Sequence, residues 1–492
     1  MIKKRMIIPK EIKSIVEYLR SKGYEAYIVG GCVRDILRGS EPEDWDVATN
    51  AKPEEIQKVF PKSFYENRFL TVTVQTGSKN QKLREIEITT YRSEAKYTDK
   101  RHPDEVSFAK NLKEDLARRD FTVNAMALEI EDQGHKIIDL FKGEQDLAQK
   151  IIRTVGKPEQ RFAEDALRML RAVRFAVSLG ESWQIEEKTC RAIKKNALWL
   201  QAISKERVRD ELMKIIMSEQ PSHGIDLLRK LGLLQYIIPE LLEGYEVSQN
   251  KHHIYDCYEH SLRSLDYGAK RNFNKYVRLA ALLHDVAKPR VKQGQGLDST
   301  FYNHEVKGAK MAAQILGRLK FSKKDIEKIV RLVRYHLFYY NVGEVTESSV
   351  RRLVRQAGPE NMEELLQVRM CDRIGSGVPK AEPYKLRHLK YLIEKASRDP
   401  LSVKMLKVTG KDVMSQLNIQ PGPKIGQILD VLLGYVLEDP KKNTRKWLLE
   451  KMSQLGHCDI VTLEKMSQSA RKTREELETK EDKMTKKKYW VT

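Results

Sequence analysis

The chain has 492 residues, about three times the length of a typical domain, so we expect several domains. Hydrophobic residues make up 40% of it, which excludes a wholly disordered protein, and no apolar run approaches the ~20 residues that cross a bilayer. Its 90 Lys and Arg outnumber its 69 Asp and Glu, and the net charge of +21 favours a polyanionic partner such as nucleic acid over a merely basic, soluble surface.

Two further features indicate an intracellular protein. The five cysteines are scattered without a CxxC pair, which fits a reducing compartment and neither a disulfide framework nor a zinc ribbon. The N-terminus is basic, but its apolar stretch stops after three residues at Pro9, too short for a signal peptide. We therefore expect a soluble cytoplasmic protein with no membrane contact, and the sequence leaves its oligomeric state open.

Up to about residue 130, strand-like and helix-like runs alternate. Residues 25–31 predict a buried strand that ends in a glycine pair, and 33–38 the helix that follows. Residues 70–75 and 84–91 alternate polar and apolar side chains with period two, as half-buried strands do. The polar stretch from Arg92 to Glu105 has no periodicity and predicts a long loop.

After about residue 150 the pattern becomes helical. Apolar side chains recur at i, i+3, i+4 and i+7 in the stretches 160–180, 205–218, 305–320, 322–338 and 424–438. Glycine- or proline-rich breaks are expected at 293–300 and 420–424. From Glu464 onward the chain is mostly charged, which predicts a solvated helix or a frayed tail.

Acidic residues near the start of the chain form the first candidate site. Asp44 and Asp46 would share one face of a strand while Trp45 points into the core, and Glu87 on a later strand is the natural third carboxylate. Neighbouring carboxylates repel unless a cation lies between them, and Mg²⁺ accepts such ligands alongside phosphate oxygens. Three acids around two Mg²⁺ ions could support in-line displacement of pyrophosphate. Alone, the Asp-x-Asp pair could merely cap and solvate the entry to a strand.

A glycine pair precedes these acids. Gly30 and Gly31 follow a strand and open a helix, where glycine lets a phosphate approach the backbone and free N–H groups attract it. Arg34 would add a fixed cationic group. A glycine pair by itself is more often only a tight turn, so it is the nearby acids that favour a nucleotide site.

A polar stripe is predicted within the basic segment 150–235. Asp165, Arg168, Arg171 and Arg174 recur every third residue and would follow one face of a single helix. An aspartate that accepts beside an arginine that donates could match cytosine or adenine and reject uracil and guanine. Spacing alone favours an ordinary salt bridge instead. Residues 150–235 carry 17 Lys and Arg against 11 Asp and Glu, which suits a phosphate-rich partner.

Histidines concentrate between residues 250 and 340. Six ligand-type residues fall in or beside predicted helices: His260, His284, Asp285, His304, His336 and Asp372. Imidazoles and carboxylates from several helices can hold one or two divalent transition-metal ions. The alternative is a structural spacer in which they are satisfied polar groups of the core.

The motifs together resemble class II tRNA nucleotidyltransferases and bacterial poly(A) polymerases of the polymerase-β-like superfamily. The resemblance rests on four motifs in the family's order: 29–35, 44–46, 118–125 and 164–175. The histidine set and Lys288 resemble the HD phosphohydrolase superfamily. Two places depart from the pattern, because Asn67–Leu70 replaces a glycine-containing turn and the extension after about residue 456 has no counterpart.

The resemblance implies roles for these residues. Asp44 and Asp46 would bind Mg²⁺ with Glu87 as the third acid, Arg119 and Asp120 would contact the sugar, Arg171 and Arg174 the triphosphate, and Asp165 and Arg168 would select CTP and ATP. Residues 408–436 resemble the region that clasps the tRNA elbow. The implied activity is CCA addition to tRNA, which the full-length loop at 92–105 favours. A poly(A) polymerase, a partial CC- or A-adding enzyme, or a phosphohydrolase acting through the HD site stays as an alternative.

We therefore predict an α+β protein whose polymerase-β-like head, a mixed sheet with helices, precedes an all-α neck, HD body and tail. The predicted domains are a catalytic head at 1–150, a neck for base recognition and RNA binding at 151–245, an HD metal-binding domain at 246–375, a tRNA-binding tail at 376–455 and a charged extension at 456–492.

Overall fold

The computed structural model describes residues 8–66, 71–95, 105–109, 111–131, 134–250, 254–397 and 402–492. The chain divides into two compact units, the first comprising Met1–His336 with Glu364–Pro379 and the second Leu337–Glu363 with Lys380–Thr492. The predicted HD segment 246–375 therefore lies mostly in the first unit, and the predicted domain boundaries stay predictions. None of the helices within the described residues is both long and apolar enough to span a membrane.

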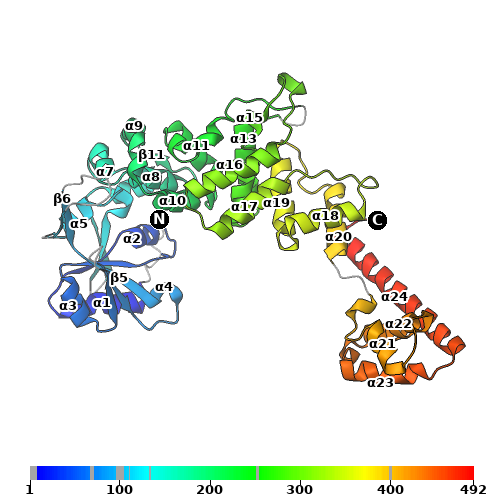
Figure 1. The fold of residues 1–492 in the computed structure, drawn as a ribbon. Coiled ribbons are helices and arrows are strands. Elements are labelled where there is room, and N and C mark those ends of the chain that lie inside the picture. The colour runs from blue at the N-terminus through cyan, green and yellow to red at the C-terminus, as the bar shows by residue number, and fades with distance from the viewer. Residues whose placement is uncertain are drawn as a thin grey trace. The chain divides into compact units, whose positions relative to one another are not determined.

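Seven of the described strands form one mixed sheet in the first unit (Figure 1). Their order is β3-β4-β5-β2-β1-β8-β9, and within this sheet β2 and β5 pair in parallel. The bounds of the strands are β1 Ala26–Val29, β2 Asp46–Thr49, β3 Ser63–Glu66, β4 Thr71–Gln75, β5 Glu85–Thr90, β8 Met126–Glu131 and β9 Gly134–Asp139. The short pairs are β6 Arg92–Ala95 with β7 Glu105–Phe108, and β10 Ile151–Ile152 with β11 Gln184–Ile185.

The sheet buries apolar side chains on both faces. Val47 on β2 belongs to the core that α1 covers through Ile12 and Leu19, whereas the next residue, Ala48, packs with Leu116 of α5 in a second cluster. A strand buried on both faces lies at the centre of a sheet, which is where β2 carries the acidic motif. The helices of this part are α1 Lys10–Ser21, α2 Gly31–Leu37, α3 Pro53–Val59, α4 Gln81–Arg84, α5 Leu112–Ala117 and α6 Gly143–Gln149.

Most predicted elements of this region are confirmed. The strands expected at 25–31, 70–75 and 84–91 are β1, β4 and β5, and α2 follows the glycine pair. The loop expected from Arg92 to Glu105 is wrong at its ends, because β6 and β7 pair there as an antiparallel ribbon. Backbone hydrogen bonds alone form such a ribbon, so it requires no alternation of polar and apolar residues. Residues 96–104 between these strands, like Asn67–Leu70, lie outside the described residues.

The rest of the first unit is helical. Its helices are α7 Pro158–Glu164, α8 Leu167–Ser178, α9 Glu187–Asn196, α10 Lys205–Ile216, α11 Pro221–Lys230, α12 Pro239–Leu242, α13 Cys257–Lys270, α14 Lys275–Leu283, α15 Lys288–Val291, α16 His304–Arg318, α17 Lys323–Tyr335 and α19 Met362–Gly375. The predicted helices at 205–218, 305–320 and 322–338 are confirmed as α10, α16 and α17.

The single helix predicted at 160–180 is wrong. Asp165 has an extended backbone (φ −144°, ψ 104°) that ends α7, and its Oδ1 accepts a hydrogen bond from the Leu167 N–H (3.0 Å) at the start of α8. A short acidic side chain that bonds the backbone in this way competes with a continuous helix. The break changes where the Asp165 carboxylate points.

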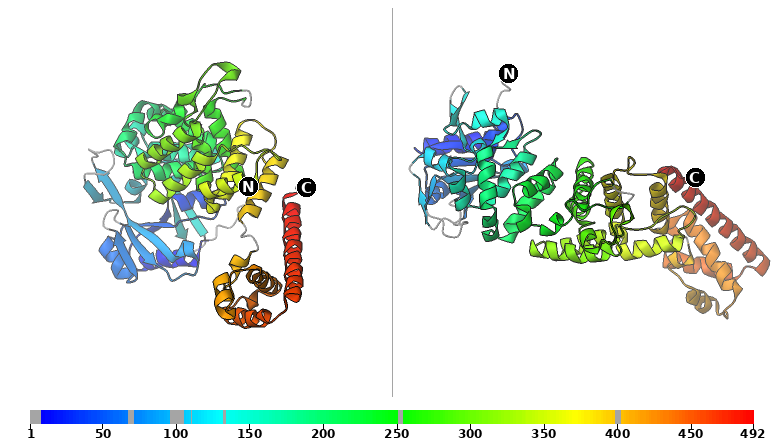
Figure 2. Two further views of the ribbon diagram at one scale, coloured as in Figure 1. Left: turned by 45° about the vertical axis from the view of Figure 1, so that its right-hand side comes forward. Right: turned by 90° about the horizontal axis from the view of Figure 1, so that it is seen from above.

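The second unit is helical in its described residues, with bounds α18 Glu347–Ala357, α20 Tyr384–Ser397, α21 Gly410–Leu417, α22 Pro423–Glu438, α23 Arg445–Gly456 and α24 Ile460–Tyr489. The helix predicted at 424–438 is confirmed as α22. The charged segment from Glu464 is part of α24, a single long helix (Figure 2). One side of α24 is buried through Leu463, Ser467 and Thr485, so the segment is a docked helix and not a frayed tail.

Candidate active site

The acidic motif lies at the start of a central strand. Asp46 is the first residue of β2, and Glu87 on β5 is its direct register partner. Neighbouring strands lie about 4.8 Å apart and paired side chains share a face, so these two carboxylates project together. Trp45 and Val47 are buried as predicted. Asp44 precedes the strand and is exposed, so the prediction that both aspartates belong to one strand is wrong.

The surroundings of Asp46 disfavour its ionised form, mainly because the carboxylate is buried. Burial raises the pKa of Asp46, the Arg119 charge opposes this rise, and the Asp44 charge adds to it. A carboxylate with a raised pKa is stabilised by an added cation. The carboxylates of Asp44, Asp46 and Glu87 do not form a group with all donor atoms within 4.8 Å among the described residues. The structure thus pairs Asp46 with Glu87 and leaves Asp44 exposed before the strand.

Gly30 joins β1 to α2 where two charged side chains approach the backbone. Its φ of 83° and ψ of −139° are rarely adopted by other residues. A Cβ at Gly30 would lie 2.8 Å from Nη1 of Arg119 and 3.4 Å from Oδ2 of Asp46. Arg119 is itself held by Asp115, with Nη2 3.2 Å from Oδ2. Gly31, the next residue, begins α2, so the glycine pair lies beside the acidic strand as the sequence predicts.

A chain of hydrogen bonds ties α2 to α8. Arg34 donates from Nη1 to Oδ1 of Asn124 (2.6 Å), and Asn124 donates from Nδ2 to Oδ1 of Asp120 (3.1 Å). The other oxygen of Asp120 accepts from Nε of Arg171 (2.7 Å). Burial opposes ionisation of Asp120, but the charges of Arg171 and Arg168 outweigh it and lower its pKa to about 2. Asp120 is therefore a fixed anion that orients Arg171.

Three guanidinium groups gather around the ring of Phe175. The guanidinium carbons of Arg174, Arg34 and Arg171 lie 4.1, 5.3 and 5.5 Å from the ring centroid. Burial lowers the pKa of Arg174 to about 10; Glu211 opposes this shift, and the neighbouring Arg171 adds to it. The lowered pKa of Arg174 thus reflects mainly the burial of its charge, to which repulsion by Arg171 adds. The cluster would therefore be stabilised by a bound anion.

The predicted base-selecting residues have partners other than each other. Arg168 donates from Nη1 to Glu164 (2.6 Å) and from Nη2 to the backbone carbonyl of Arg118 (3.0 Å). Asp165 instead accepts from Nη2 of Arg207 on α10 (2.7 Å). The predicted stripe on one helix is wrong for Asp165, because this residue precedes α8.

Sequence reasoning missed several residues of this site, among them Asn124, Arg207 and Glu211. Asn124 lies within the quoted motif at 118–125, so its position in that motif was a usable signal. Arg207 and Glu211 lie on a predicted helix with ordinary charge spacing, and nothing local indicates that they reach Asp165 and Arg174.

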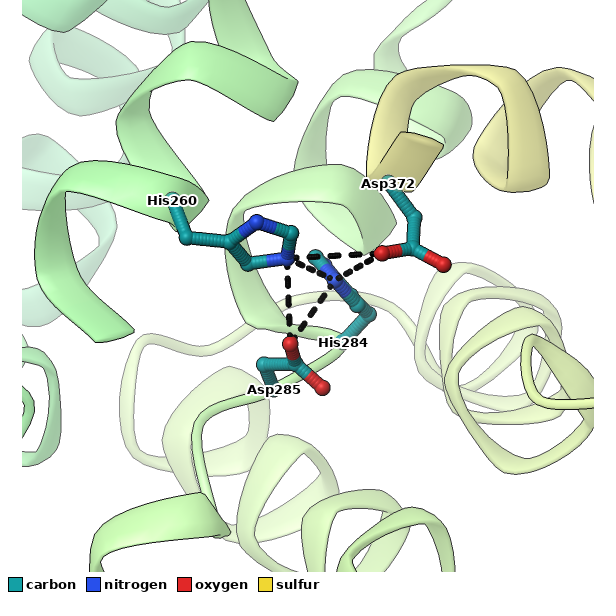
Figure 3. A group of neighbouring side chains, drawn as sticks. All are labelled: His260, His284, Asp285 and Asp372. Carbon is teal, nitrogen blue, oxygen red and sulfur yellow. Dashed lines mark hydrogen bonds and ion pairs between the residues drawn. The ribbon is translucent and has the colours of Figure 1, made fainter. Parts of the chain in front are cut away.

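The histidine-rich residues converge in the first unit. Figure 3 shows His260 on α13, His284 and Asp285 after α14, and Asp372 on α19 pointing toward one another. Nε2 of His260 lies 2.9 Å from Nε2 of His284 and 3.0 Å from Oδ2 of Asp285. The neighbouring Lys288 lies 2.6 Å from the same carboxylate oxygen.

A second group shares the Asp285 carboxylate. Its Oδ1 lies 3.4 Å from Nε2 of His304, the first residue of α16, and 3.7 Å from Nε2 of His336, which follows α17. The donor atoms of Asp285, His304 and His336 lie within 4.8 Å of one another, and all three residues are buried. The structure thus brings together all six residues that the sequence singled out, in two groups that share one carboxylate.

Three of the imidazoles are oriented by the backbone. Nδ1 of His284, His304 and His336 lies 2.8, 2.7 and 2.7 Å from the carbonyl oxygen three residues earlier. Because a carbonyl only accepts, Nδ1 carries the proton in the neutral ring and Nε2 presents a lone pair to the cluster. This donor set of imidazoles and carboxylates fits a divalent transition metal. Burial would lower the pKa of His284, but Asp285 and Asp372 raise it to about 10, so bound metal would displace a proton there.

Comparisons with known families agree with this architecture. Residues 26–153 match the poly A polymerase head domain, residues 183–244 the probable RNA and SrmB-binding site of polymerase A, and residues 257–374 the HD domain. Fold and site together define a nucleotidyltransferase with a poly A polymerase head and an HD domain, as the motifs predicted.

Similar proteins identify the family more closely. The CCA-adding enzyme of Ligilactobacillus salivarius is 34% identical over 465 residues, which cover 90% of this chain and 99% of that protein. The solved CCA-adding enzyme of Bacillus stearothermophilus in complex with CTP has a TM-score of 0.57 at 27% identity and covers 92% of this chain and 100% of that one. The Thermotoga maritima CCA-adding enzyme complexed with tRNA_CCA shares the fold, with a TM-score of 0.53 at 21% identity over 91% of this chain and 96% of that one. The chain belongs to the family of CCA-adding enzymes, which are tRNA nucleotidyltransferases.

Proposed function

We propose that this protein adds C, C and A to the 3′ end of tRNA, with CTP and ATP as substrates. The family supports the reaction, and relatives solved with CTP and with tRNA support the substrate classes. The observation that carries the proposal is the pairing of Asp46 with Glu87 beside Gly30. An acidic pair next to a glycine that opens a helix is what a nucleoside triphosphate and its metal ions require.

Asp44, Asp46 and Glu87 are the proposed Mg²⁺ ligands. Their oxygen donors and the raised pKa of Asp46 fit a hard divalent cation. Two bound Mg²⁺ ions would supply positive charge for ionisation of the attacking 3′-hydroxyl and for the pyrophosphate that leaves. The chain itself holds Asp46 and Glu87 on neighbouring strands, which keeps the geometry of these two acids rigid during the displacement.

The arginine cluster around Phe175 is the proposed triphosphate site. Arg171 and Arg174 would bind the phosphates, and Arg34 of α2, whose guanidinium lies over the same Phe175 ring, would add its charge there. Three guanidinium groups gathered around one ring favour a polyanion over a neutral ligand. Arg119 and Asp120 are proposed to contact the sugar.

Asp165 and Arg168 are the proposed template for the base. Asp165 can accept from an exocyclic amine, and Arg168 can donate to ring acceptors of cytosine or adenine. Arg207 fixes the Asp165 carboxylate and Glu164 fixes the Arg168 guanidinium, so neither group turns freely. Uracil or guanine presents a carbonyl at the place of the amine, where it would face the Asp165 carboxylate acceptor against acceptor, so a pair held in this way rejects it.

A nucleotide-incorporation assay tests this function. The purified protein is offered a tRNA that ends at the discriminator base, with labelled CTP and ATP separately and then together. We expect two C residues from CTP alone, one A only after them, and no product with Asp46→Asn. Runs of A from ATP alone would instead identify a poly(A) polymerase, and a product lacking C or A would identify a partial enzyme.

The HD site supports a second activity, hydrolysis of phosphoesters such as a cyclic phosphate that blocks a tRNA end. The observation that favours it is the pair of buried ligand groups that share Asp285. His284→Ala should abolish metal-dependent phosphoesterase activity and leave CCA addition intact, whereas Asp44→Ala should do the reverse. Equal loss of both activities in His284→Ala, with the fold retained, would contradict separate sites.

A further inference from the structure

Helix α24 carries basic residues on two sides that differ in their partners. On the side packed in the second unit, Arg471 is paired with Asp430 and Lys488 with Glu394, each at 2.7 Å. These cations are neutralised by the unit's own acids. They are therefore part of how the helix docks, and they leave little charge for another molecule.

The opposite side of α24 carries a row of lysines, here called the lysine stripe: Lys465, Lys472, Lys480, Lys483 and Lys487. All five are exposed, and none makes an ion pair with any residue that the structure describes. At ~100° per residue they fall within an arc of about 80°, and at ~1.5 Å per residue they extend over about 33 Å. Glu476 is the acid that falls within this arc.

Such a row is unfavourable for the helix by itself. Lys483 and Lys487 are four residues apart, and like charges at this spacing destabilise a helix by a few tenths of a kcal/mol. A helix exposed only for solubility would mix both signs on this face. The unpaired charge is compensated when a polyanion lies along the helix.

A nucleic-acid duplex matches this surface better than a membrane does. A duplex presents about one charge per 1.7 Å of its axis, or about 20 charges over the length of the stripe. A helix that lies on a membrane needs an apolar face beside the basic one. The stripe is instead flanked by exposed polar residues such as Gln468 and Thr479. Between its first and last lysines, Met484 is the one exposed large apolar side chain among the described residues.

We propose that the lysine stripe of α24 binds the phosphate backbone of a helical arm of the tRNA, as a sequence-independent contact outside the head. The identity of this partner rests on the proposed function, since the substrate of CCA addition is the RNA at hand. The contact raises affinity for tRNA and takes no part in the choice between CTP and ATP.

Salt dependence of tRNA binding tests the inference in the full-length protein. The stripe variant combines Lys472→Gln, Lys483→Gln and Lys487→Gln. Its control removes the same charge from cations that already have acidic partners, with Arg471→Gln, Lys488→Gln and Lys486→Gln, whose Nζ lies 3.7 Å from Asp482. Each phosphate contact contributes about 0.9 to the slope of log K against log [salt]. With three lysines replaced, the slope for the stripe variant should therefore be smaller by about 2.7. Between 50 and 200 mM salt its affinity should then fall about 40-fold less than that of the unaltered protein. The control should keep the original slope.

Further readouts separate this inference from its alternatives. Circular dichroism should show unchanged helix content, because glutamine is a good helix former. A stripe variant that keeps the original slope overturns the inference, as does a loss of binding to anionic lipid vesicles with tRNA binding unchanged. Reduced tRNA affinity with no CCA addition by either protein would refute the proposed function and leave the stripe as an RNA-binding surface.

Discussion

Replacing Gly30 with alanine should impair both stability and catalysis. The backbone at Gly30 has φ 83°, and holding a side chain in such a region costs on the order of 1–3 kcal/mol. The new Cβ would also lie 2.8 Å from Nη1 of Arg119, where ordinary contact begins near ~3.5 Å, so this group must move by about 0.7 Å. Arg119 cannot move freely because it is paired with Asp115. Displacements of this size at a reacting centre cost roughly 10–100-fold in rate.

Gly39 provides the matched control. It also has a positive φ, 75°, but an added Cβ there would meet no atom within 4 Å. Gly39→Ala should therefore lower the melting temperature without lowering kcat for incorporation of CTP into tRNA. The reasoning would be refuted if Gly30→Ala kept kcat within about twofold of the original, or if Gly39→Ala lost as much activity.

Three other changes probe the neighbouring contacts. Arg207→Leu should weaken discrimination against UTP and GTP, measured as ratios of kcat/KM, because the Asp165 carboxylate loses its 2.7 Å partner. The control Arg209→Leu, on the same helix, should leave that discrimination unchanged. Phe175→Leu should raise KM for CTP and ATP alike and leave base choice unchanged. Phe175→Tyr should keep the original KM, since its ring still stacks on the arginines. A change in base choice would count against this role. In the HD site, elemental analysis should find less metal per chain in His304→Gln and none in Asp285→Asn, since both ligand groups share Asp285. Full metal content in Asp285→Asn would contradict the shared carboxylate.

Local patterns in the sequence were sufficient for much of the fold. The strand at 84–91 is visible because it buries every second side chain, and the strand at 70–75 shows the same alternation from Val72 onward; that pattern is encoded within a few residues. The helices at 205–218 and 322–338 are visible for the same reason at helical spacing. The order of the four motifs identified the family without any knowledge of distances.

Contacts between distant segments were not encoded in such patterns. The β6–β7 ribbon depends on backbone pairing, so its side chains carry no period. Asp165 ends α7 and does not lie within a continuous helix. Its carboxylate accepts hydrogen bonds from the following backbone and from Arg207, which is 42 residues away. The Arg207 partner cannot be inferred from residue spacing.

The amino-acid sequence by itself singled out the residues that we propose carry the chemistry: the acids near the start, the arginines after residue 165, and the six histidine-site residues. Residue types and local periodicity suffice for that, because they depend on a few neighbours along the chain. Only the tertiary structure decided how these groups are paired. It placed Glu87 beside Asp46, paired Asp165 with Arg207, and divided the histidines into two groups around Asp285. Such pairings follow from how strands and helices pack, a property of the whole fold.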